Sequence, residues 1–167
     1  MVKVISAAAL ALAIAAPASA QAALGPDAAS CRAGAAEPAL LVDVSGFKAR
    51  SGELRVQLYG SNPDDFLAKG KKLRRIDLPV TQSGPMKVCV AVPGPGTYAI
   101  AVRHDLDGNG KSGWSDGGGF SRNPNISLFH LRPKLAEVAI NVGNGVKPID
   151  VVLNYRQGVS IGPVANN

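Results

Sequence analysis

The sequence has few of the residues that carry acid–base or nucleophilic chemistry. It contains only two histidines and two cysteines in 167 residues, and aromatic residues make up 5% of it. Charged residues are also scarce at 18%, whereas apolar residues reach 46%. This is the composition of an ordinary globular protein, which excludes a disordered or collagen-like chain. We therefore expect one domain with an apolar core, and the sequence contains no complete catalytic constellation.

Long apolar runs are absent after the first twenty residues. Lys3 precedes an uncharged apolar run from Val4 to Ala16, and the small residues Ala18-Ser19-Ala20 follow. This is the pattern of a secretory signal peptide cleaved after Ala20. The run is also shorter than the roughly 20 apolar residues that a membrane-spanning helix needs. We expect residues 1–20 to be a signal peptide and the mature chain to be periplasmic or secreted, without a transmembrane segment.

The two cysteines and the net charge fit an exported protein. An even number of cysteines in an oxidising compartment favours a disulfide between Cys31 and Cys89 over a metal pair, with a nucleophilic cysteine as the alternative. The formal net charge is +6, and it falls to +5 when Lys3 is removed with the signal peptide. A basic exported chain suits an anionic envelope component as partner, and we expect no binding to nucleic acid.

A helical period is absent, and apolar residues instead alternate with polar ones. The alternation is typical of half-buried strands, with Gly, Pro and Asn in the turns between them. The segments that show it are 40–44, 54–58, 76–80, 86–92, 98–102, 138–142 and 149–153. Seven short strands predict an all-β fold, an antiparallel immunoglobulin-like β-sandwich over residues 39–156. We expect residues 21–38 to form an irregular N-terminal arm and residues 157–167 a flexible C-terminal tail.

One loop combines acidic residues, asparagine and glycine at spacings that suit a cation. Numbered from Asp105, oxygen ligands fall where an EF-hand-type calcium loop places them, and Gly110 permits the sharp turn. The candidate metal ligands are Asp105, Asp107, Asn109, Lys111 and Asp116. Against calcium, the last ligand is Asp rather than Glu and no helices flank the loop. The alternative is a tight turn that uses these residue types for their backbone tolerance.

A second candidate site is a cluster of five cations within seven positions. Its members are Lys69, Lys71, Lys72, Arg74 and Arg75. The cluster is a candidate surface for an anionic glycan, a lipid head group or a peptidoglycan stem. The alternative is a solvated loop or strand edge, where lysines also block the addition of further strands.

Several stretches of this sequence resemble a bacterial family, domain of unknown function 2141. They read Gly-Glu-Leu-Arg-Val-Gln-Leu-Tyr at 52–59, Phe-Leu at 66–67, Pro-Gly-Thr-Tyr-Ala-Ile-Ala-Val-Arg-His-Asp at 95–105, Asp-Gly-Asn-Gly-Lys at 107–111 and Gly-Phe-Ser at 119–121. The resemblance covers about residues 40–155 and implies an exported bacterial β-sandwich without an assigned activity. The chain departs from the family pattern between residues 111 and 119.

Two functions follow as hypotheses. The first is a non-enzymatic exported module that binds a partner or an envelope surface through loops on a rigid sandwich, with calcium as its candidate cofactor. The second is a small hydrolase or ligand-processing domain that uses His104 with Asp105. Paired acid–base groups in a concave pocket would favour the second hypothesis.

Overall fold

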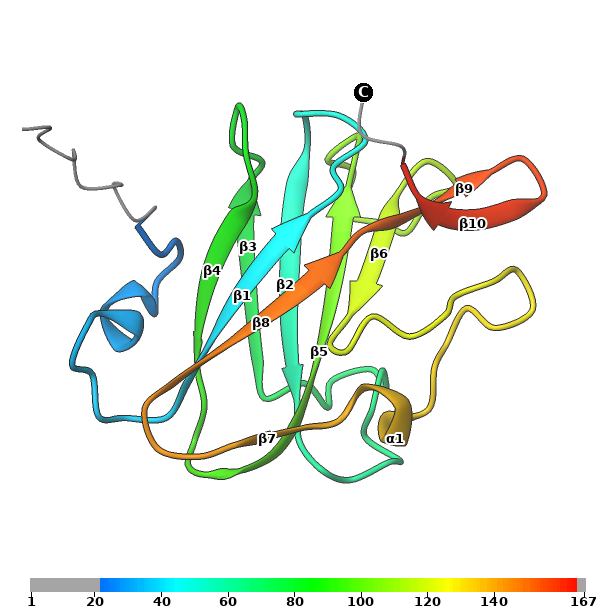
Figure 1. Cartoon of the computed structure of the whole chain (residues 1–167). Helices are drawn as coiled ribbons and strands as arrows, with labels where there is room; N and C mark the ends of the chain where they lie inside the picture. The colour runs from blue at the N-terminus through cyan, green and yellow to red at the C-terminus, as the bar shows by residue number, and fades with distance from the viewer. Residues whose placement is uncertain (1–21, 165–167) are drawn as a thin grey trace, which may run out of the picture.

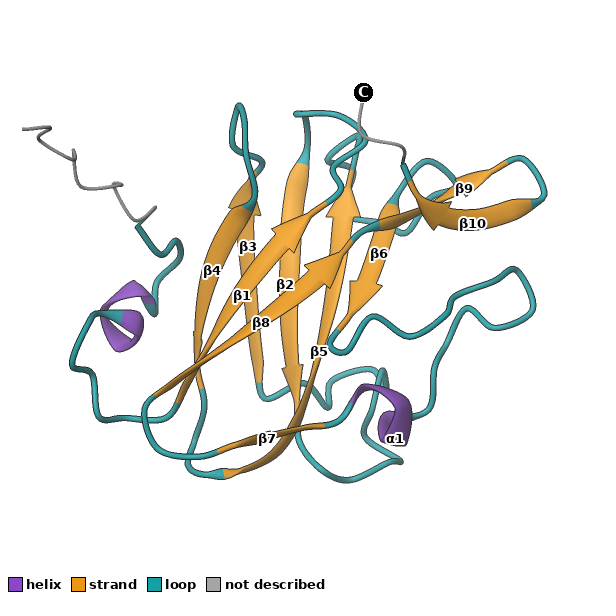
Figure 2. Cartoon of the chain, in the orientation of Figure 1, coloured by secondary structure: helices purple, strands orange, loops and turns teal. Residues whose placement is uncertain are grey.

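The structure of the chain is a computed structural model that describes residues 22–164. The expected signal peptide, residues 1–20, lies outside the described residues. Two β-sheets face one another, and the short helical segments lie at the periphery (Figures 1 and 2). The all-β sandwich predicted from the alternating pattern is confirmed. No helix within residues 22–164 has the length and apolar character needed to cross a membrane.

The described residues form ten strands and two short helical segments. The strands are β1 (Ala39–Ser45), β2 (Glu53–Tyr59), β3 (Arg74–Pro79), β4 (Met86–Ala91), β5 (Gly96–Asp105), β6 (Gly117–Phe120), β7 (Ile140–Val142), β8 (Val146–Val152), β9 (Asn154–Gln157) and β10 (Ser160–Pro163). The helical segments are a 3₁₀ turn, η1 (Ala28–Cys31), and one α-helical turn, α1 (Leu135–Val138). Each of the seven predicted segments contains a strand, but the first residues of the 138–142 segment belong to α1 and its C-cap.

The strands divide into a three-stranded and a seven-stranded sheet. The first has the order β4-β1-β8, and the second has the order β10-β9-β6-β5-β2-β3, with β7 paired to β5. All pairs are antiparallel except β1 with β8, which run parallel with Leu40 opposite Lys147 and Val44 opposite Val151. The prediction of a purely antiparallel sandwich is wrong at this pair. Since β8 enters the sheet from the far end of the chain, its direction is not set by a hairpin turn.

The core lies between the two sheets and uses the predicted strand faces. Val56, Val90, Ile100 and Val102 are all buried. Tyr98 is buried as well, and its hydroxyl donates to the Gly94 carbonyl at 2.8 Å. Such a bond to backbone a few residues upstream is the tyrosine-corner arrangement of β-sandwiches.

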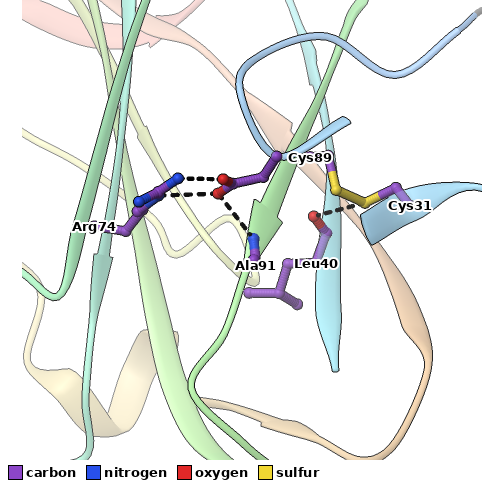
Figure 3. The surroundings of a disulfide bond; sticks show 6 residues. Cys31, Leu40, Arg74, Cys89 and Ala91 are labelled. Carbon is purple, nitrogen blue, oxygen red and sulfur yellow. Dashed lines mark hydrogen bonds and ion pairs between the residues drawn. A yellow bond between two sulfur atoms is a disulfide. The ribbon is translucent and has the colours of Figure 1, made fainter. Parts of the chain in front are cut away.

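A disulfide ties the N-terminal arm to the outer face of the three-stranded sheet. It joins Cys31 at the end of η1 to Cys89 of β4, as Figure 3 shows. Backbone hydrogen bonds between Leu24 and β4 and an ion pair between Asp27 and Arg74 hold the same arm. Cys89 alternates with Val88 and Val90, so it points away from the core, but the arm covers it completely. The arm that was expected to be irregular therefore contains a short 3₁₀ turn.

The C-terminal segment differs from the expected flexible tail. Residues 154–163 form a β-hairpin, β9 and β10, which extends the larger sheet beyond β6 (Figure 1). Gln157 stabilises the hairpin, because its side-chain amide donates hydrogen bonds to the carbonyls of Gly162 and Pro163 at 3.1 and 2.9 Å. The hairpin was missed because its strands are four residues long and have no clear alternation.

Candidate functional site

The acidic loop connects the end of β5 to the start of β6. Asp105 is the last residue of β5, and Asp116 directly precedes β6. The antiparallel pairing of β5 with β6 therefore brings the two ends of the loop together. Asp105 is only 1% exposed, whereas Asp107 lies at the surface. The loop thus has a buried acidic end and a solvent-facing acidic tip.

Three carboxylates converge inside this loop. Asp105, Asp107 and Asp116 each place a carboxylate oxygen within 4.8 Å of the others. One oxygen of Asp105 accepts hydrogen bonds from the Gly110 amide and from Arg103, both at 2.9 Å. Its other oxygen, Oδ1, is buried and has no hydrogen-bond partner. Buried carboxylate oxygens are normally satisfied, so this atom is one that a bound cation would satisfy.

The other two predicted ligands contribute differently. The Asn109 side-chain oxygen accepts from the Lys111 amide at 2.7 Å, and the Asn109 amide groups donate to Asp107 at 2.6 and 3.2 Å. These are turn-forming contacts of the kind that Asx residues make in any tight loop. The structure therefore brings three of the five predicted ligands together and uses Asn109 and Lys111 to shape the turn.

The electrostatics of the loop favour the ionised form of Asp105. Burial raises the pKa of Asp105, but the Gly110 amide and the Arg103 guanidinium outweigh it, so that the pKa lies below its ordinary value. Asp116 is held by the amides of Leu106 and Gly113, at 3.1 and 2.8 Å. Backbone donors thus fix two of the carboxylates in place, and Arg103 is the one cation in the described residues that is ion-paired with any of the three.

His104 lies beneath the loop and is fully buried. Its Nε2 lies 2.8 Å from the Ser51 carbonyl, which only accepts, so Nε2 carries a hydrogen and donates it to this carbonyl. Its Nδ1 lies 2.6 Å from the Tyr155 hydroxyl, and burial raises the pKa of Tyr155 to about 12. The hydroxyl therefore stays protonated, and it shares a hydrogen bond with Nδ1. Both ring nitrogens are occupied, so the geometry does not support the acid–base role that the hydrolase hypothesis gives His104.

The Tyr155 hydroxyl also accepts from the Lys48 amide at 3.2 Å, so it links three segments of the chain. We expect Tyr155→Phe to destabilise the protein by about 2 kcal/mol, since it leaves the His104 Nδ1 and the Lys48 amide unsatisfied. Urea unfolding measures this loss. Tyr59→Phe is the matched control, because the Tyr59 hydroxyl makes no hydrogen bond within residues 22–164. Equal stability of the two variants would contradict the structural role of the Tyr155–His104 pair.

The predicted basic surface is partly neutralised by ion pairs. Arg74 pairs with Asp27, Arg75 with Asp77 at 2.6 Å, and Lys71 with Asp65 at 3.4 Å. Lys69 and Lys72 have no ion pair among the described residues. Three of the five cations are thus engaged within the protein, and a role of this cluster in binding an anionic surface stays a prediction.

A cleft beside the acidic loop was not predicted from the sequence. It has a volume of about 240 Å³, and Trp114 at its rim lies against Arg156, with the guanidinium carbon 4.1 Å from the ring centroid. The lining comes from three separate segments: 113–120, 126–131 and 154–161. No short motif could reveal it, since each segment supplies only a few of the lining side chains.

Comparison with known proteins identifies a family but no characterised relative. The model of a family described as uncharacterized protein conserved in bacteria (DUF2141) matches residues 42–150. This stretch includes the whole acidic loop and most of the sandwich. No curated protein and no solved structure matches the chain.

Proposed function

The chain belongs to the DUF2141 family of uncharacterised bacterial proteins, and we propose that it is an exported, non-enzymatic β-sandwich module that binds calcium and an envelope component. The calcium ion would lie in the loop of residues 105–116. The observation that carries this proposal is the convergence of three carboxylates around Asp105, whose buried Oδ1 has no partner.

The donor set suits calcium better than zinc. Calcium takes six to eight oxygen ligands in flexible geometry, and carboxylates from Asp105, Asp107 and Asp116 supply the charged ones. The same carboxylates offer no nitrogen or sulfur, which zinc prefers. Arg103 competes for Asp105, and position 12 of the loop is the short side chain of Asp116. Both features favour the weak affinities of extracellular modules, with dissociation constants of roughly 10⁻⁴ to 10⁻³ M.

Two observations support the exported location. The first twenty residues have the pattern of a signal peptide, and Cys31 and Cys89 form a disulfide, which persists in oxidising compartments.

Calorimetric titration with calcium tests the ion site. We expect saturable binding by the chain from Gln21 to Asn167 in the range given above. We also expect a calcium-dependent gain in stability of about 1.4 kcal/mol when calcium is at ten times its dissociation constant. Asp107→Asn should abolish both effects. Asp64→Asn, an exposed residue in another loop, changes the net charge equally and should leave them intact.

The calcium site would be refuted by an absence of saturable heat up to about 10 mM calcium, which is well above the weak extracellular range. It would also be refuted if Asp64→Asn and Asp107→Asn reduced the response equally, because the response would then depend on net charge. Sodium at matched ionic strength controls for general salt effects.

A further inference from the structure

The walls of the cleft beside the acidic loop are two segments that project from the sandwich. One wall is the loop that contains Ile126, Leu128 and Leu131, and the other is the β9–β10 hairpin (Figure 1). The floor is β6, with Gly118 and Phe120, and Trp114 closes the side next to the acidic loop. The lining is therefore largely apolar, although the cleft opens to solvent.

The exposed apolar side chains of the described residues gather around this cleft. Five large ones have more than half of their surface exposed: Leu73 51%, Trp114 78%, Phe129 101%, Leu131 52% and Val159 89%. Trp114 and Leu131 line the cleft. Phe129 lies in one wall, between two lining residues, and Val159 lies in the turn between β9 and β10. Only Leu73 lies elsewhere. The large exposed apolar side chains of the described residues are therefore concentrated around this cleft.

The formal charges in the floor and walls of the cleft are positive, whereas the acidic loop lies at one side of it. Residues 117–134 and 151–164, which form its floor and walls, contain no aspartate or glutamate. They contain four cations, Arg122, Arg132, Lys134 and Arg156. The acidic residue that lines the cleft is Asp116, and backbone amides occupy both of its oxygens. Arg156 is the cation that lines the cleft, and the other three lie in the same segments as the protruding apolar tips. The surface is therefore amphipathic, with positive charge in its walls and the acidic loop at one side.

We propose that this surface docks the protein on an anionic lipid bilayer, with Trp114, Phe129, Leu131 and Val159 at the membrane interface. The apolar tips would enter the boundary between head groups and acyl chains, where Trp is favoured. The cations would lie at the level of the negatively charged head groups. The proposal deepens the envelope-binding part of the proposed function and does not depend on calcium.

The single tryptophan of the chain reports directly on this contact. The chain from Gln21 to Asn167 is mixed in EDTA with vesicles of phosphatidylcholine, with or without phosphatidylglycerol. The apolar run at residues 4–16 is omitted because it would bind lipid by itself. We expect the tryptophan emission to shift to shorter wavelength, and the protein to sediment with the vesicles, only when phosphatidylglycerol is present. High salt should weaken the binding.

Substitutions distinguish docking through the apolar tips from general attraction of a basic protein. We expect Phe129→Ser to lower the partition coefficient about tenfold, from the loss of one large buried apolar side chain. Leu131→Ser should also lower it, whereas Leu73→Ser should leave it unchanged although both leucines are equally exposed.

Three results would overturn the proposal: no binding to anionic vesicles, equal binding by Leu131→Ser and Leu73→Ser, or an emission shift that follows self-association in the absence of lipid. Because EDTA removes calcium from the assay, each of these results would leave the calcium titration unaffected. Conversely, a negative calcium titration would leave the vesicle experiment valid.

Discussion

Alanine in place of Gly52 is expected to destabilise the protein by about 2–5 kcal/mol. Gly52 has a φ of +74°, a conformation that costs a residue with a Cβ about 1–2 kcal/mol. A Cβ at this position would also overlap the carbonyl oxygen of Asp105 and lie 2.7 Å from that of Leu106. Both contacts are backbone atoms at the entrance of the acidic loop, so neither can move without disturbing the β2–β5 pairing. Overpacking of this kind adds about 1–3 kcal/mol.

A comparison with Gly84 separates the cost of the backbone conformation from the cost of the steric overlap. Gly84 has nearly the same φ, +71°, but a Cβ there would meet no atom within 4 Å. We expect Gly84→Ala to cost only the conformational part, about 1–2 kcal/mol. Urea unfolding of both variants measures the difference. If Gly52→Ala were no less stable than Gly84→Ala, the close approach of the 105–106 backbone to Gly52 would be wrong.

Loss of the disulfide is expected to cost about 4 kcal/mol. Cys31 and Cys89 are separated by 58 residues, and closing a loop of that length lowers the entropy of the unfolded chain by a corresponding amount. The double variant Cys31→Ala/Cys89→Ala should therefore unfold at a much lower denaturant concentration. The arm is also held by backbone hydrogen bonds between Leu24 and β4 and by the Ala91 amide, which donates to Asp27, so it should stay bound to β4 in the folded state of the variant.

Reduced wild type is the control for that variant. It should match the double variant in stability, because both lack the covalent link. Titration of thiols in the unfolded, unreduced wild type should find none. Two reactive thiols per chain would contradict the disulfide, and equal stability of oxidised and reduced protein would contradict its role in stability.

The strands of the sandwich could be predicted wherever burial is encoded by alternating apolar side chains. At β6, close packing instead depends on glycines, which have no side chain. A Cβ at Gly117 would overlap the Tyr155 ring, and one at Gly119 would lie 2.7 Å from Val151. These two glycines let β6 pack directly against the segments around Val151 and Tyr155, and a run of three glycines gives no period from which a strand could be predicted.

The candidate site was predictable to the extent that it is local in sequence. The spacing of Asp105, Asp107 and Asp116 was enough to predict that they lie close together, because a tight loop between two paired strands brings its two ends to the same place. The role of His104 was not predictable, since it depends on Tyr155, 51 residues further along the chain. The cleft was missed for the same reason: its lining is assembled from three segments.

The parallel pairing of β1 with β8 also determines the order in which this protein can fold. β1 lies between β4 and β8, and its partner residues in β8 are more than one hundred positions away. The three-stranded sheet therefore cannot be completed until nearly the entire chain is available, and such non-local pairings are associated with slow folding, in milliseconds to seconds. Cys31 and Cys89, by contrast, both lie on the N-terminal side of β5. Oxidation can therefore anchor the arm to β4 while the second edge of β1 is still unpaired, and during that interval the nascent domain exposes a strand edge on which aggregation can begin.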